Sequence, residues 1–305
     1  MDFIIQNILN ALQWGSFYAL IALGYTLVYG VLRLINFAHG DVFMVGAYIA
    51  FFVSGFMLGD TLGLSPTVTF LCALPVTMIL TSLVGVTLER IAYRPLRRKG
   101  AHRLYVVITA LMCGLILEYS NLAVLGASRL KFPELIHKTV WNIGGVTVTN
   151  LKVIVIVTAV LVFLFLNFIV TRTKIGMAMR GISYDKFAIP LMGIPIDNII
   201  VFTFILGSGF AGLAGLLFAM SYPILEPFMG MLIGWKAFIA AVVGGIGDIK
   251  GAFVGGFLLG FIEVGVVALP FLESTYRDLF AFTILLIILW IKPTGLFGMP
   301  QSTKI

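Results

Sequence analysis

The sequence predicts an all-α integral membrane protein, a polytopic bundle of about eight to ten transmembrane helices. Its 305 residues are 60% hydrophobic and only 11% charged, and the mean hydropathy is +1.10. A soluble domain carries roughly 25% charged residues, because a compact globule needs polar surface to face water. Lipid must therefore surround most of this chain. Its length suits one membrane domain, residues 1–305, with nothing left for a sizeable soluble domain.

Uncharged runs long enough to cross the bilayer recur along the sequence. A helix needs about 20 mostly apolar residues for this, and residues 3–32 form the first such run, with room for an extra turn. The later expected spans are residues 42–59, 61–88, 104–125, 153–171 and 198–220, a segment after a glycine-rich break at 244–251, and residues 276–292. The long first run and the broken segment can each be counted in two ways, so the expected number of transmembrane helices is a range of about eight to ten.

Basic residues gather in two of the connections between these runs. Residues 89–103 contain six Lys and Arg residues, and residues 171–197 contain four. Cytoplasmic loops carry such an excess, so the net charge of +7 is read as a topology signal rather than as a nucleic-acid surface. Both connections are predicted to be cytoplasmic, as is the C-terminus. The N-terminus is predicted to be external.

The segment 35–41 (INFAHGD) is the most informative polar interruption. Asn36, His39, Gly40 and Asp41 are costly in hydrocarbon unless they line a cavity or lie at the membrane interface. Free amides at the start of a half-helix would also suit a carboxylate. Two interpretations remain open: an interfacial turn whose polar groups bond to the backbone, or part of a solute path or gate.

A second break contains Gly244, Gly245 and Gly247, and its Gly247-Asp248 pair repeats Gly40-Asp41. The repeat is either a trace of two related halves, with breaks at corresponding depths, or a chance match. These glycines are further candidates for the solute path.

Two carboxylates, Glu118 and Glu263, fall within spans, near the predicted outer ends. A carboxylate at the centre of a membrane helix costs roughly 3 kcal/mol, so both are expected at the interface, with Lys236 as a guessed partner for one of them.

Small residues recur at four-residue spacing, which lets helix backbones approach closely in a bilayer. These faces serve either packing within the chain or contact with a second membrane subunit. They are Gly207, Ala211 and Gly215, then Gly251 with Gly255, and Gly256 with Gly260.

No motif for enzymatic chemistry or for a cofactor is present. The sequence contains no GxxxxGK followed by Ser or Thr, no HExxH and no CxxC, and its two cysteines lack metal-ligand spacing. We therefore expect no cofactor, no metal and no enzyme activity. If ATP drives transport, another chain must hydrolyse it.

The connection 171–194 combines basic charge with an amphipathic stretch, residues 185–192, that ends at Gly193. A short helix along the cytoplasmic face would either dock into a groove on a soluble partner or rest in the lipid headgroups.

These residues closely resemble the branched-chain amino acid permease family of ABC importers, in particular the H-type subunit of the Liv systems. The matching segments follow the family order over nearly the whole chain. They are residues 18–24, INFAHG at 35–40, 46–48, 89–95, LMGI at 191–194, 236–238, GGIG at 244–247, and PTGLFG at 293–298.

The resemblance implies partners and an architecture that composition does not show. It implies a second, M-type permease subunit, two cytoplasmic ATPase subunits and a periplasmic substrate-binding protein, in the bacterial inner membrane. The implied architecture is the one shared with cobalamin and ribose importer permeases. The implied ATPase-coupling helix contains Asp185, Ala188, Leu191, Met192 and Gly193.

One departure from the family pattern concerns that helix. The pattern is Glu-Ala-Ala, three residues, then Gly, whereas this chain has Phe187-Ala188-Ile189 before Pro190. The acidic residue is missing, which puts an ion pair to the ATPase in doubt.

The resulting hypothesis is a permease subunit that moves leucine, isoleucine or valine by alternating access, energised by separate ATPases. One alternative is a urea or short-chain amide permease of the same family. The other, from a different class, is a self-contained channel or proton-coupled carrier, motivated by His39 and Asp41.

Overall fold

The computed structural model describes residues 2–58, 62–186, 188–269 and 274–298. Seven of the described helices are long and apolar enough to cross a membrane, which confirms the polytopic helical prediction. They are α1 (Asp2–Leu32), α2 (His39–Leu58), the continuous helix Pro66–Arg98, α5 (Arg103–Leu125), α6 (Asn150–Arg172), α9 (Ile196–Ser221) and α11 (Ile249–Val267). Two shorter apolar helices, α10 (Met229–Gly245) and α12 (Arg277–Ile291), pack with them.

The remaining elements are short. Two antiparallel pairs join β1 (Leu130–Lys131) to β4 (Ile224–Leu225) and β2 (Val140–Ile143) to β3 (Val146–Thr149). Both glycines of the β2–β3 turn, Gly144 and Gly145, have positive φ, as a tight two-residue hairpin turn requires. A 3₁₀ turn, η2 (Ser274–Tyr276), precedes α12.

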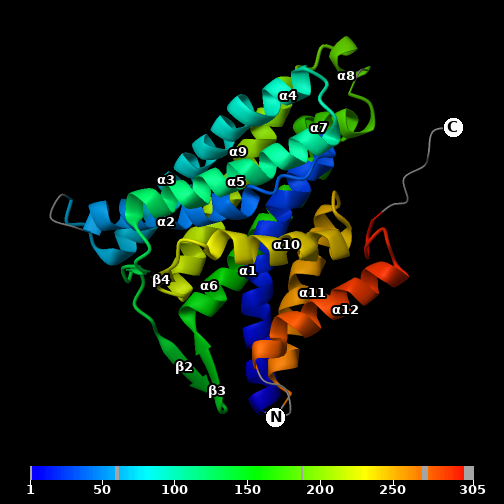
Figure 1. Ribbon diagram of the computed structural model, residues 1–305. Helices are drawn as coiled ribbons and strands as arrows, with labels where there is room; N and C mark the ends of the chain where they lie inside the picture. The colour runs from blue at the N-terminus through cyan, green and yellow to red at the C-terminus, as the bar shows by residue number, and fades with distance from the viewer. Residues whose placement is uncertain (1, 59–61, 187, 270–273, 299–305) are drawn as a thin grey trace.

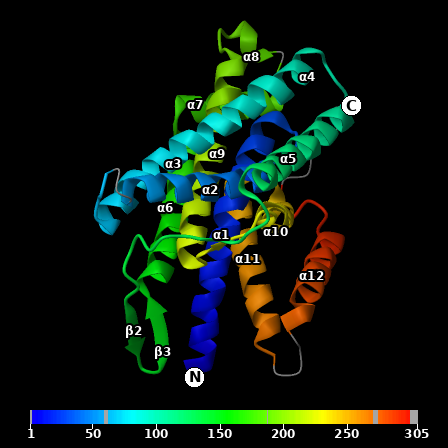
Figure 2. The same ribbon diagram turned by 60° about the vertical axis from the view of Figure 1, so that its left-hand side comes forward.

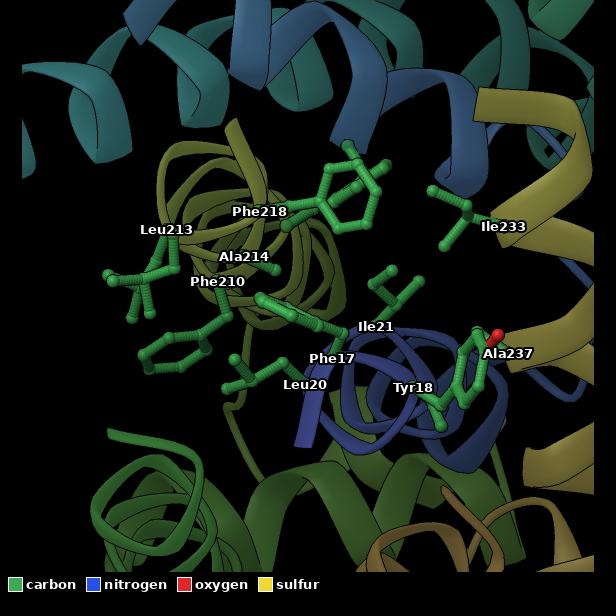
Figure 3. Packing of buried hydrophobic residues seen from close by; sticks show 14 of the residues in the cluster. Phe17, Tyr18, Leu20, Ile21, Phe210, Leu213, Ala214, Phe218, Ile233 and Ala237 are labelled. Atoms are coloured by element: carbon green, nitrogen blue, oxygen red, sulfur yellow. The ribbon is translucent and has the colours of Figure 1, made fainter. Parts of the chain in front are cut away.

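Helix α1 forms the centre of the bundle, and the predicted first run is a single helix. Every residue from 15 to 28 is buried, so α1 is covered on all sides, as expected for a helix that is apolar all round. Figure 3 shows Phe17, Leu20 and Ile21 of α1 directed toward Phe210, Ala214 and Phe218 of α9. The outer helices α3 (Pro66–Leu88), α5 and α6 bury much less of their surface. Their exposed apolar side chains suit contact with lipid.

Small residues bring these helices into backbone contact. Gly256 and Gly260 of α11 face Ala19 and Gly15 of α1 so closely that a Cβ at either α11 glycine would meet the α1 main chain. Gly207 likewise faces Gly24. The other predicted small-residue positions are also occupied from within the chain, with Gly215 against α2, and Gly251 and Gly255 against α10. The alternative that these faces bind a second subunit is therefore wrong, because helices of the same chain fill them.

The two ends of the bundle differ in composition. At one end, the start of α1 contacts the β2–β3 hairpin, where the Thr147 amide donates to Gln6 Oε1 at 2.8 Å. At the opposite end lie α4 (Arg94–Arg98), α7 (Lys174–Tyr184) and α8 (Ala188–Leu191), as Figures 1 and 2 show. Both basic connections thus lie at the same end. Which end faces the cytoplasm stays a prediction.

The first basic connection is not a loop over most of its length. Helix α3 continues through a π-helical turn, η1 (Glu89–Tyr93), into α4. Buried Glu89 accepts hydrogen bonds from Arg94 at 2.7 Å and from Arg97 at 3.0 Å. Arg97 also pairs with Asp197 at the start of α9, at 2.5 Å. These ion pairs hold the basic segment in a helical conformation that its charge alone did not predict.

Candidate functional site

The polar segment 35–41 forms the entry into α2. His39, Gly40 and Asp41 are its first residues, and all three are buried. The start of α2 packs against the start of α10, where a Cβ on Gly40 would lie 2.6 Å from the Gly230 carbonyl oxygen and 2.7 Å from Gly234 Cα. Glycine at this position therefore lets the two helix backbones touch. His39, Gly40 and Asp41 thus form a buried helix start within the bundle. Their depth in the membrane, and with it the choice between an interfacial place and a solute path, stays a prediction.

Asp41 holds its carboxylate between two glycines of other helices. A Cβ on Gly230 of α10 would lie 2.9 Å from Asp41 Oδ1, and one on Gly114 of α5 would collide with Oδ2. Asp41 is 7% exposed, and its Oδ1 has no hydrogen-bond partner. The position at the start of α2 that we expected to suit an external carboxylate is occupied by a carboxylate of the chain itself.

Glu118 lies one helical turn beyond Gly114 on the same face of α5. It is 3% exposed, and its Oε1 also lacks a hydrogen-bond partner. Glu118 is therefore buried among helices, and its expected place at the membrane interface stays a prediction. The only feature of the sequence that could have indicated this buried position is the spacing of Glu118, four residues after Gly114.

These two carboxylates line a cavity of about 220 Å³ between α2, α5 and α10, which we call the acidic pocket. The rest of its lining is apolar, aromatic or glycine. It consists of Tyr25, Phe37, Gly40, Leu111, Met112, Leu115, Gly230, Met231, Gly234 and Trp235. No basic side chain contributes to this lining.

The other predicted path residues lie elsewhere. His39 is 1% exposed and packs edge-on against Tyr25 at 4.8 Å between ring centroids, against Gly24 and outside the pocket lining. Asn36 accepts a hydrogen bond of 2.6 Å from the Tyr93 hydroxyl, which fastens the α1–α2 connection to η1. His39 and Asp41 therefore do not form a proton-relay pair.

The second break is a tight junction between α10 and α11. Asp248 caps α11 by accepting from the Gly251 amide at 2.7 Å, and Gly244 lies against the Gly251 main chain. The segment after α12 seals the junction, with the Phe297 amide donating to the Gly244 carbonyl at 2.9 Å. Gly245 packs on this segment, and Gly247 packs against Gly30 at the end of α1. Gly244, Gly245 and Gly247 are not part of the acidic pocket lining, so the structure does not bring the two breaks together.

A buried ion cluster joins α10, α11 and α12. Lys236 Nζ lies 3.0 Å from Glu263 Oε1 and 2.6 Å from Asp278 Oδ1, and the Tyr18 hydroxyl donates to Glu263 Oε2 at 2.8 Å. Lys236 and Glu263 are each 2% exposed. The guessed partnership of Lys236 is thus confirmed for Glu263, and the expected interfacial place of Glu263 stays a prediction.

A larger cavity of about 640 Å³ lies near the start of α1 and reaches this cluster. Its polar lining includes Asn10, Gln13, Lys152, Glu263 and Arg277. Here Glu263 already has cationic neighbours, and Lys152 Nζ donates to Asn10 Oδ1 at 2.7 Å. This cavity therefore contains no unpaired carboxylate of the kind found in the acidic pocket.

The predicted coupling residues form a small projection at the end of the bundle. Helix α8 covers only Ala188–Leu191, so the expected helix over residues 185–192 is shorter than predicted, and the longer helix of this connection is α7. The Ala188 amide donates to Asp185 Oδ1 at 3.2 Å, and Ile189 packs on Gly181 of α7. Phe187 lies outside the described residues.

The tip of this projection is strongly exposed. Leu191 is 89% exposed and Met192 is 73% exposed, and Gly193 ends the turn with a φ of +77°. Figures 1 and 2 show α8 standing clear of the helices that form the bundle. An apolar tip at a polar end of the molecule is the feature that a docking helix needs.

A bundle of membrane-length helices with a small pocket between them and a projecting apolar tip suits a membrane permease. Residues 7–289 match the family described as branched-chain amino acid transport system, permease component. The chain therefore belongs to this family of ABC transporter permeases, as the resemblance in its motifs indicated.

Individual relatives match over almost their full length. The chain is 38% identical over 306 residues to the high-affinity branched-chain amino acid transport system permease protein BraD of Pseudomonas aeruginosa, covering 99% of this chain and 98% of that protein. It is 34% identical over 311 residues to the corresponding permease protein LivH of Escherichia coli K12, with the same coverage. Among solved structures, PsaBC from Streptococcus pneumoniae in complex with Fab aligns with a TM-score of 0.49 at 14% identity, covering 97% of this chain and 94% of that chain.

Proposed function

We propose that this chain is the H-type permease subunit of an importer for branched-chain amino acids in the bacterial inner membrane. Its similarity to BraD and LivH over 98% of their length supports this substrate class. The proposed complex also contains an M-type permease subunit, two cytoplasmic ATPase subunits and a periplasmic substrate-binding protein. The chain would move its solute by alternating access between the two faces of the membrane.

The exposed α8 tip is the observation that carries the assignment of an energy-supplying partner. Leu191 and Met192 are apolar, yet they extend from the end of the bundle that holds both basic connections. If that end is cytoplasmic, as the excess of Lys and Arg predicts, the tip faces the compartment that contains ATP. An ATPase groove that covers the tip would remove this apolar surface from water and transmit its own closure to α7 and α9.

Reconstitution with and without ATP tests this proposal. Proteoliposomes that contain this chain, its partner permease and the two ATPases should accumulate radiolabelled leucine only when ATP and the binding protein are both supplied. Omission of the ATPases provides the control. Uptake of leucine by this chain alone, insensitive to ATP, would contradict the proposal and favour a self-contained carrier. Uptake of urea but not leucine would favour the amide permease alternative.

A further inference from the structure

The acidic pocket contains the two buried carboxylates of the described chain that have no cationic partner. Four acidic side chains are buried in the described residues: Asp41, Glu89, Glu118 and Glu263. Glu89 is paired with Arg94 and Arg97, and Glu263 with Lys236. In the same part of the chain, Asp41 and Glu118 form no ion pair.

Burial of unpaired carboxylates is unfavourable, because the protein interior does not replace the hydration that each charge loses. Two charged carboxylates that line one pocket also repel each other, and a cation between them would reduce both costs. Asp41 also lies in the first turn of α2, where the helix dipole favours a negative charge. The pocket is thus prepared for a positively charged group that comes from outside the chain.

The remaining lining restricts which cation can enter. Within the described residues, no group of three or more His, Cys, Asp or Glu side chains could hold a metal ion. The walls instead contain the aliphatic and thioether side chains Leu111, Met112, Leu115 and Met231. Phe37 and Trp235 also line the cavity, and the face of an aromatic ring attracts an ammonium group. These walls suit an organic cation with a short apolar chain.

The size of the pocket limits the ligand further. About 220 Å³ lies below the roughly 300–1,000 Å³ of pockets that hold drug-sized ligands, so the ligand is a small solute.

We propose that the carboxylates of Asp41 and Glu118 bind the ammonium group of the amino acid in transit, while its aliphatic side chain contacts Met112, Leu115 and Met231. This inference rests on the proposed function. It also gives the permease its own selection against neutral solutes such as urea and amides, which offer no positive charge.

The first test replaces each carboxylate with its amide in the complete transporter. Proteoliposomes are supplied with ATP and saturating leucine-loaded binding protein, and the rate of radiolabelled leucine uptake is measured. We expect Asp41→Asn and Glu118→Gln each to lower this rate about 10- to 100-fold, the range for losing one hydrogen bond to a charged group. Glu118→Asp, which keeps the charge, should restore part of the rate. Glu134→Gln, at an exposed carboxylate, should leave it unchanged.

Thermal unfolding in detergent separates this role from a structural one. Because neither carboxylate forms an ion pair within the described chain, their neutralisation should leave the unfolding midpoint unchanged or raise it. If the midpoints of Asp41→Asn and Glu118→Gln instead fall together with uptake, the carboxylates support the fold and the inference is overturned.

The second test identifies the recognised group with two analogues. Isoamylamine carries an ammonium group on a branched aliphatic chain, and isocaproate carries a carboxylate on a similar chain. In saturation-transfer NMR on the complete transporter without binding protein, isoamylamine should bind and displace leucine, whereas isocaproate should do neither. The isoamylamine signal should disappear in Glu118→Gln.

The outcomes distinguish this inference from the proposed function. If the unmodified transporter shows no ATP-driven leucine uptake, the proposed function itself fails. If it transports leucine and both amide variants match its rate, or if isocaproate binds as well as isoamylamine, only the role of the acidic pocket is overturned.

Discussion

Lys236 of α10 and Glu263 of α11 form an ion pair of 3.0 Å in which each side chain is 2% exposed. The pair joins two helices, and Tyr18 of the central helix completes it with a hydrogen bond to Glu263 Oε2. Such a pair is not a net source of stability, because its attraction must offset the loss of hydration of both charges. The removal of one member, however, leaves the other charge buried and unpaired.

We therefore expect Glu263→Gln to destabilise the fold strongly. Loss of one partner of a buried pair typically costs about 3–5 kcal/mol. Because Lys236 keeps Asp278 at 2.6 Å, the cost should fall near the lower end of that range. The unfolding midpoint in detergent is the measurement. Arg129→Met provides the control, since it breaks the exposed Arg129–Glu226 pair and should cost about 1 kcal/mol or less. Equal shifts for the two variants would show that burial of the pair has no effect.

Close packing between α1 and α11 predicts that α11 tolerates a leucine at one glycine position but not at another. Gly256→Leu should prevent normal folding, because a Cβ there meets the main chain of Ala19, which cannot move aside as a side chain would. Overpacking of a core costs about 1–3 kcal/mol even where side chains can adjust. Gly265→Leu on the same helix has open space and should fold normally. The yield of monodisperse protein on size-exclusion chromatography measures this, and equal yields would contradict the packing.

The acidic pocket predicts a steric effect at Gly114. Gly114→Ala places a methyl group where it collides with Asp41 Oδ2, so leucine uptake by the complete transporter should fall severalfold. Gly55→Ala is the matched control in α2, because no atom lies within 4 Å of its Cβ position. It should retain transport, and its stability should rise by about 0.5–1 kcal/mol from the better helix propensity of alanine. Normal uptake by Gly114→Ala would indicate that the Asp41 carboxylate can shift without loss of function.

The turn after α8 predicts uncoupling of ATP hydrolysis from transport. Gly193 has a φ of +77°, which a β-branched residue adopts only with strain, so Gly193→Val should displace the Leu191–Met192 tip. The ratio of leucine transported to ATP hydrolysed should fall. Gly100→Val, at a φ of +64° in the other basic connection, introduces the same strain away from the tip and should preserve the ratio. Parallel losses in both variants would argue against a special role for the tip.

Much of this architecture follows from composition and periodicity. The apolar runs predicted the membrane helices because each must satisfy its backbone hydrogen bonds within itself in lipid. The small-residue spacing predicted close helix contacts, and the polar break at 35–41 pointed to the site that contains Asp41. Local sequence did not predict the helix that continues through residues 89–98, because its stability depends on Arg97 reaching both Glu89 and Asp197.

By itself, the sequence determined that this protein is a multi-span membrane bundle of the branched-chain amino acid permease family, because hydropathy and short motifs are local properties of the chain. The tertiary structure alone decided which charges are paired. Lys236 and Glu263 form an ion pair, whereas Asp41 of α2 and Glu118 of α5 line one pocket and form no ion pair within the described chain. The physical reason is that the fate of a buried charge depends on neighbours from distant parts of the chain, and only the packing of the helices brings those neighbours together.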